Sequence, residues 1–100
     1  MKITIENEGG TIVARFAGRL DTAASAEVLP TIQSLEEQAD QHIVLDCKEL
    51  EYISSSGLRL FLTLRKASSA KGGKLQVRSI NADIRQVFMM TGFISLFEII

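Results

Sequence analysis

Residues 42–65 read HIVLDCKELEYISSSGLRLFLTLR, and this stretch contains the strongest structural signal in the chain. The segment His42–Cys47 contains three apolar residues in succession, which is typical of a central parallel strand covered on both faces. From Ser56 to Ala70, apolar side chains recur at helical spacing and cover most of the helix circumference. We therefore expect a buried strand, a serine turn and a mostly buried helix.

Two alternating segments come before this stretch. Polar and apolar residues alternate over Lys2–Glu6 and again over Thr11–Ala17, as they do in half-buried strands. Between them, Asn7–Gly10 is a turn signal. The start of the chain is therefore predicted to form an antiparallel hairpin.

A helix is expected between the hairpin and the buried strand. Asp21 or Thr22 is placed to cap it, and Pro30 should kink it or delay its true start. Its predicted buried face consists of residues at helical spacing: Val28, Ile32, Leu35 and Ala39.

The C-terminal part repeats the alternation of strand and helix. Glycines at 72, 73 and 92 end two helices, and Asn81 caps the second of these. Strands are predicted over Lys74–Arg78 and Leu96–Ile100, and the intervening helix has a core face of Ile84, Val87 and Phe88. Met89-Met90 is open to two interpretations, an adaptable contact surface or part of the core.

The predicted fold is α/β, with the element order β-β-α-β-α-β-α-β in a single domain over residues 1–100. A mixed, largely parallel sheet of about five strands carries the N-terminal hairpin at its edge and about three helices. The length of 100 residues fits one domain, and the 46% apolar content argues against disorder.

Bulk chemistry excludes several classes of protein. A net charge of −1 provides no attraction for nucleic acid. His42 and Cys47 are each the only residue of their type, so we expect no disulfide, no metal site and no cofactor, and Cys47 as a buried thiol. No apolar run could span a bilayer, and Met1 leads directly into a strand pattern rather than a signal peptide, which predicts a cytoplasmic protein.

The candidate functional segment is the serine turn. In an open α/β sheet, binding sites gather where strand ends meet helix N-termini. One serine before a helix is usually a cap for an unpaired backbone N–H. Three in succession exceed what a cap needs, and we expect Ser54, Ser55 and Arg59 to be at least partly exposed while Leu58 and Phe61 are buried.

At these residues the chain resembles the STAS domain family, which includes the anti-sigma factor antagonists. The signature-like segment is Ile53–Arg59. Phe16–Asp21 is similar to the family's G-x-L-D element, and Ile43–Asp46 to its central strand. Gly73–Leu75, Val87-Phe88 and Thr91–Phe93 are similar to its C-terminal half, in the same order.

The resemblance implies a regulatory module that binds an anti-sigma factor with serine-kinase activity and is released by phosphorylation. It places the phosphoacceptor at Ser55 and implies a phosphatase as a further candidate partner. Ser54 stands where the family motif typically has an acidic residue, whereas Asp21 keeps the family's second acidic position. The expected partner surface combines two turns: Asp21 and Thr22 from one, and Ser54, Ser55, Ser56, Gly57, Leu58 and Arg59 from the other.

Three other functions are alternatives to this one. A constitutive scaffold or accessory subunit, of a lipid-transport or stress-signalling complex, would use the same surface without a switch. A nucleotide-phosphate binder lacks a P-loop-like glycine pattern. An enzyme is the least favoured, because a serine nucleophile needs a base and His42 lies at the opposite end of the strand from the serines. Arg19, Arg59 and Lys66 are interpreted as a solvated stripe rather than a phosphate clamp.

Overall fold

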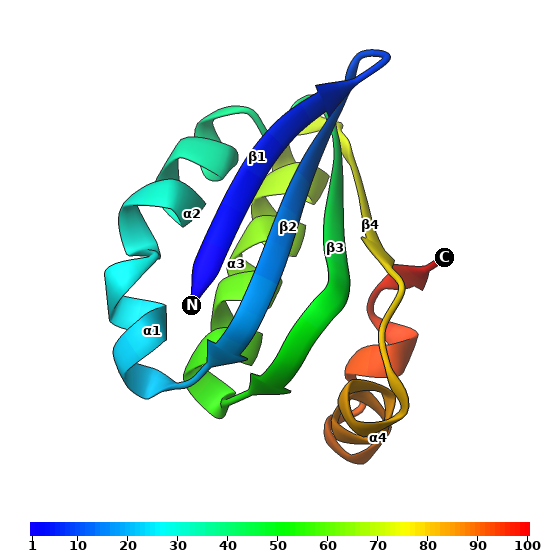
Figure 1. The fold of residues 1–100 in the computed structure, drawn as a ribbon. Helices are drawn as coiled ribbons and strands as arrows, with labels where there is room; N and C mark the ends of the chain where they lie inside the picture. The colour runs from blue at the N-terminus through cyan, green and yellow to red at the C-terminus, as the bar shows by residue number, and fades with distance from the viewer.

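The computed structural model describes residues 1–100 and is built around a mixed five-stranded sheet in the order β1-β2-β3-β4-β5 (Figure 1). β1 (Lys2–Glu8) and β2 (Thr11–Leu20) form the antiparallel hairpin. β3 (His42–Ile53), β4 (Lys74–Arg78) and the short β5 (Glu98–Ile99) continue the sheet in parallel. The predicted class, hairpin and element order are confirmed.

Pro30 divides the first predicted helix into two. α1 (Thr22–Glu27) ends before Val28, and α2 (Leu29–Glu37) begins with the proline in its first turn. Proline is tolerated there because the first-turn N–H groups have no partner within the helix. The predicted inner face is confirmed, since Val28, Ile32, Leu35 and Ala39 are all buried.

The remaining helices follow β3 and β4. α3 (Ser55–Lys71) connects β3 to β4, and α4 (Ala82–Thr91) is followed by the 3₁₀ turn η1 (Phe93–Ser95) before β5. The ring of Phe61 on α3 packs at 5.2 Å from Phe16 and at 6.4 Å from both Phe88 and Phe97, measured between ring centroids. One hydrophobic core therefore joins the sheet, α3, α4 and the C-terminal segment.

The expectation that β3 is covered on both faces is wrong. α1, α2 and α3 all lie behind the sheet in Figure 1, and the opposite face carries no helix. Ile43 and Leu45 belong to the core, whereas Val44 is buried but lies outside the core cluster. Each parallel connection steps to the next strand in the same direction, and right-handed connections of this kind place every helix on one face.

Two expectations for the C-terminal part need correction. The predicted strand Leu96–Ile100 is reduced to Glu98–Ile99, with Leu96 in a turn and Phe97 in the core. Met89 and Met90 are 62% and 78% exposed, so the core interpretation of this pair is wrong. Ile84 and Phe88, one turn apart, take the buried face of α4 instead.

Candidate partner-binding site

One rim of the sheet collects the ends of β2 and β3, and α1 and α3 begin just after them; β4 ends earlier, opposite Asp46, and α4 follows after a three-residue connection. Asp21, Ser54 and Asn81 cap these helices, each accepting a hydrogen bond from the backbone N–H three residues later, at 2.8, 3.2 and 2.8 Å. The positive ends of the α1 and α3 dipoles therefore lie side by side at this rim. We call Asp21, Thr22 and the turn Ser54–Arg59 the serine rim.

The three serines have different roles in the structure. Ser54 is the cap, and its backbone N–H donates to the carbonyl of Leu20 at 2.9 Å, which ties the end of β3 to the end of β2. Ser55 is the first residue of α3, is exposed, and its hydroxyl makes no hydrogen bond within the protein. Ser56 is half-buried. The cap is therefore complete without Ser55, whose hydroxyl is free.

The predicted exposure of this segment is confirmed. Leu58 and Phe61 are buried at 6% and 0% exposure, whereas Ser54 is half-buried and Ser55 and Arg59 are exposed. The buried residues anchor the first turn of α3 to the core. This anchoring holds the polar residues of the turn toward solvent.

Gly57 allows α3 to begin close against the sheet. A Cβ atom at this position would lie 2.9 Å from both Ile53 Cγ1 and Leu20 Cγ, closer than carbon atoms normally approach. The glycine therefore lets the serine turn sit directly over the ends of β2 and β3.

The two turns of the serine rim lie side by side. Leu20 pairs with Ile53 in the parallel register, so the Asp21-Thr22 turn and the Ser54 turn leave adjacent strands at the same level. The Asp21 carboxylate caps α1, and Thr22 is exposed. The structure thus brings the eight predicted residues together, but Gly57 and Leu58 are buried, so the exposed surface is formed by the other six.

Arg19 and Tyr52 extend the rim onto the open face of the sheet, and the pair was missed by sequence reasoning. The two residues are in register on β2 and β3, and the Arg19 guanidinium lies over the Tyr52 ring at 4.4 Å from its centroid. Each residue stands two positions before a helix cap. This equal spacing from the ends of two parallel strands was the signal in the sequence that could have identified the pair.

His42, the one histidine of the chain, lies at the far end of β3 from the serine turn. β3 separates His42 from Ser54 by twelve residues, about 40 Å of extended chain. The His42 ring is held instead by Thr11 Oγ1 at 3.1 Å and Gln76 Oε1 at 2.6 Å. Burial raises the pKa of the Cys47 thiol to about 12, and no cluster of three or more His, Cys, Asp or Glu side chains is arranged to hold a metal ion.

The serine rim is a surface rather than a pocket. None of the three cavities in the protein is lined by any of its residues. This geometry suits contact with another protein better than enclosure of a small molecule. None of the helices has the length and apolar character needed to cross a bilayer.

The chain is similar in sequence and in fold to known anti-sigma factor antagonists. The chain is 29% identical over 100 residues to the anti-sigma F factor antagonist of Paenibacillus polymyxa, covering 99% of this chain and 86% of that protein. It superposes on an anti-sigma factor antagonist from Mycobacterium paratuberculosis with a TM-score of 0.86 at 18% identity, covering 98% and 83% of the two chains.

A second solved protein, SpoIIAA from Bacillus, is known in two forms. The unphosphorylated and phosphorylated structures match with TM-scores of 0.74 and 0.73 at 22% identity, covering 99% of this chain and 87% and 91% of those chains. At such identities the two structures establish the fold. The sequence model described as the STAS domain matches residues 2–100. The chain therefore belongs to the STAS domain family.

Proposed function

We propose that this protein is an anti-sigma factor antagonist that binds an anti-sigma kinase through the serine rim and is released when Ser55 is phosphorylated. The observation that carries the proposal is the division of roles between Ser54 and Ser55. Ser54 caps α3, which leaves the Ser55 hydroxyl exposed and without a partner in the protein. A kinase can therefore modify Ser55 without first breaking a hydrogen bond of the fold.

The helix N-terminus makes phosphorylation compatible with the folded state. A phosphate adds about −1.5 to −2 charges and three strong acceptor oxygens. At Ser55 these oxygens would lie beside the free N–H groups of the first turn of α3, which favour an anion. A partner pressed against the same turn would have to desolvate this charge, so the modification ejects the partner and leaves the fold intact.

The relatives support the same assignment. The Paenibacillus polymyxa protein is named as an antagonist of an anti-sigma factor, and SpoIIAA has been solved in a phosphorylated form. In our proposal the partner is an anti-sigma factor with serine-kinase activity, a phosphatase reverses the modification, and the protein acts in the cytoplasm. The protein itself catalyses no reaction in this scheme.

The test is a titration against each serine-kinase-type anti-sigma factor of the source organism. Unmodified protein and the Ser55→Ala variant should bind one of these factors with similar affinity. Phosphorylated protein should lose binding, and Ser55→Asp should lose part of it because a carboxylate carries about one charge against nearly two on a phosphate. Ser69→Ala, at an exposed position near the other end of α3 and outside the serine rim, serves as the matched control and should bind as the wild type does.

Two results would contradict the proposal. Equal affinity of the phosphorylated and unmodified forms would leave the constitutive scaffold as the better assignment. Turnover of an ester, phosphate or nucleotide that disappears with Ser55→Ala would overturn the non-enzymatic role.

A further inference from the structure

The largest cavity of the protein lies on the open face of the sheet, away from the serine rim. Its volume is about 550 Å³, and it spreads over β1, β2, β3 and the end of β4. Ala17 lies in the middle, with Lys2 opposite it on β1 and Glu49 opposite it on β3. Because alanine carries only a methyl group, a hollow forms between longer side chains, and we call it the sheet groove.

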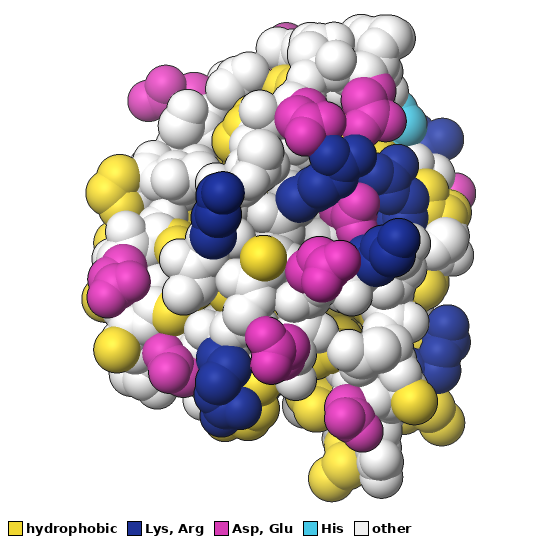
Figure 2. Space-filling view, viewed as in Figure 1, with side chains coloured by type: hydrophobic (Ala, Val, Ile, Leu, Met, Phe, Trp, Pro, Cys, Tyr) yellow, Lys and Arg dark blue, Asp and Glu magenta, His cyan; other side chains and the backbone are white.

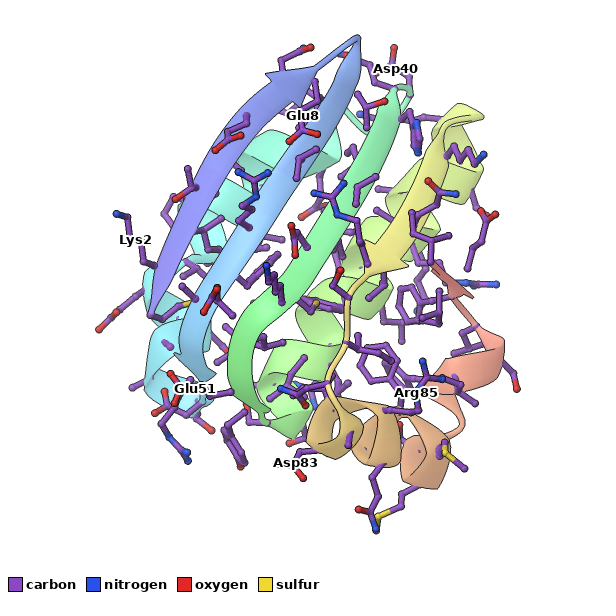
Figure 3. The ribbon with its side chains drawn as sticks, turned by 45° about the vertical axis from the view of Figure 1, so that its right-hand side comes forward. Lys2, Glu8, Asp40, Glu51, Asp83 and Arg85 are labelled. Atoms are coloured by element: carbon purple, nitrogen blue, oxygen red, sulfur yellow. The ribbon has the colours of Figure 1, made fainter.

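Charged side chains surround the sheet groove. Figure 2 shows Lys, Arg, Asp and Glu side chains gathered over the exposed face of the sheet. In Figure 3 they rise from the strands on the side opposite the helices, with Lys2 and Glu8 at different levels of β1. Lys2, Arg15, Lys48 and Arg78 line the groove from four different strands, together with the carboxylates of Asp46 and Glu49.

A β-bulge turns two neighbouring residues of β3 toward the groove. Arg15 pairs with Asp46 and Ala17 pairs with Glu49, so Cys47 and Lys48 together oppose the single residue between Arg15 and Ala17. Regular alternation would send Lys48 and Glu49 to opposite faces, yet both are exposed and both line the groove. Bulges of this kind re-aim side chains and are over-represented near functional sites.

The polar contacts of the open face engage all three side-chain nitrogens of Arg15 and both carboxylate oxygens of Asp46. Asp46 accepts hydrogen bonds from Arg15 Nε at 3.3 Å, Arg78 Nη2 at 2.9 Å and Lys48 N–H at 3.0 Å. The two remaining nitrogens of Arg15 bind Glu6 at 2.6 Å and Glu8 at 2.9 Å. The network therefore explains Arg15 and Asp46, but it does not use every cation of the groove.

Three cationic side chains of the groove keep donors that the ion pairs do not use: Lys2, Lys48 and Arg78. Neither lysine ammonium group takes part in an ion pair, and Arg78 engages Asp46 through one nitrogen only. Glu49 is the one lining carboxylate without a salt bridge. Three cationic donors thus converge on one hollow, with a single free acceptor beside them.

The hydroxyl of Ser79 lies at the edge of the groove, on a residue whose backbone conformation is strained. It is the only non-glycine residue with a positive φ, 62°, and it lines the groove just after β4. Its backbone N–H is held by the carbonyl of Ile100 at 3.2 Å. A serine in this left-handed conformation is strained, and such strain clusters at ligand clamps.

We propose that the sheet groove binds a small phosphorylated metabolite that also carries hydroxyl groups, such as a sugar phosphate. The phosphate would lie among Lys2, Lys48 and Arg78, within reach of the Ser79 hydroxyl. Glu49 accepts hydrogen bonds from the ligand's hydroxyl groups, and without such donors it repels the phosphate. A volume of about 550 Å³ is within the range of small-molecule sites.

Isotope-labelled protein titrated with ribose 5-phosphate, and separately with inorganic phosphate, tests the proposal by NMR. Saturable shifts should appear at the amides of Lys2, Ala17, Lys48, Glu49 and Ser79, with ribose 5-phosphate binding more tightly than phosphate. Lys48→Gln should weaken binding about tenfold, which is the loss of one charge-assisted hydrogen bond. Glu49→Gln should tighten binding of inorganic phosphate and reduce the preference for the sugar phosphate.

The matched control is Lys66→Gln on the exposed side of α3, outside the groove. It should bind both probes as the wild type does, and circular dichroism should show that every variant is folded. Equal weakening by Lys66→Gln would reduce the effect to net charge and overturn the proposal. Absence of saturable shifts at the groove residues, or shifts confined to Ser54–Gly57, would overturn it as well.

Discussion

Gly57 is the single residue on which the position of the serine rim depends most. A methyl group there would overlap Ile53 and Leu20, neither of which can move away freely inside the core. Gly57→Ala should therefore lower the free energy of unfolding by about 1–3 kcal/mol, even though alanine is the better helix former. Urea denaturation measures this, with Ser56→Ala as a control that should change stability by less than about 0.5 kcal/mol. A Gly57→Ala variant more stable than the wild type would contradict the tight packing.

Asp46 gives stability a dependence on pH. Burial of its carboxylate acts to raise the pKa, but the hydrogen bonds from Lys48 N–H, Arg78 and Arg15 outweigh burial and hold the pKa of Asp46 below its ordinary value. The unfolded chain then takes up the proton first as the pH falls. The stabilisation is therefore present at neutral pH and is lost progressively below about pH 5.

Asp46→Asn tests this directly. The variant should be less stable than the wild type at neutral pH by about 1–3 kcal/mol, and the difference should shrink as the pH falls toward 3. Urea unfolding at several pH values measures both quantities. Asp40→Asn, at an exposed residue in the turn before β3, is the matched control and should keep the acid dependence of the wild type. A constant difference between wild type and Asp46→Asn at every pH would contradict the role of its charge.

Among the secondary-structure elements, α3 depends on Ser54 for its start. Ser54→Ala removes the acceptor for the N–H of Gly57 and should cost about 1 kcal/mol of stability. Ser55→Ala removes a hydroxyl that makes no hydrogen bond within the protein and should cost less. Thermal unfolding of the two variants side by side distinguishes them, and the opposite order would assign the cap to Ser55. That result would also remove the basis for a free phosphoacceptor.

The molecule as a whole should unfold in one step because it has one core. Phe61 contacts Phe16 on β2, Phe88 on α4 and Phe97 near the C-terminus, so Phe61→Ala should cost about 3–5 kcal/mol. Tyrosine fluorescence from Tyr52 and the helical circular dichroism signal should shift to the same lower urea concentration. Leu60→Ala, at a half-buried position on the same helix, should shift both signals less. Separate transitions from the two probes would contradict a single cooperative unit.

Much of this fold follows from local patterns in the chain. The alternation in β1 and β2, the helical spacing in α3 and α4, and the caps Asp21 and Asn81 act over a few residues and were predictable. The same is true of the adjacency of the two turns of the serine rim, because parallel strands bring their carboxyl ends to one edge of a sheet.

Other features depend on contacts between segments far apart in the sequence. The apolar run of β3 predicted a strand covered on both faces, but the hand of the connections left one face open. Which serine caps α3 depends on how far pairing with β2 extends β3, and that pairing ends at Ile53. The stacking of Arg19 on Tyr52 and the bulge that exposes both Lys48 and Glu49 arise from the same register. Cross-strand register is a property of two paired segments, so the pattern of either segment alone does not contain it.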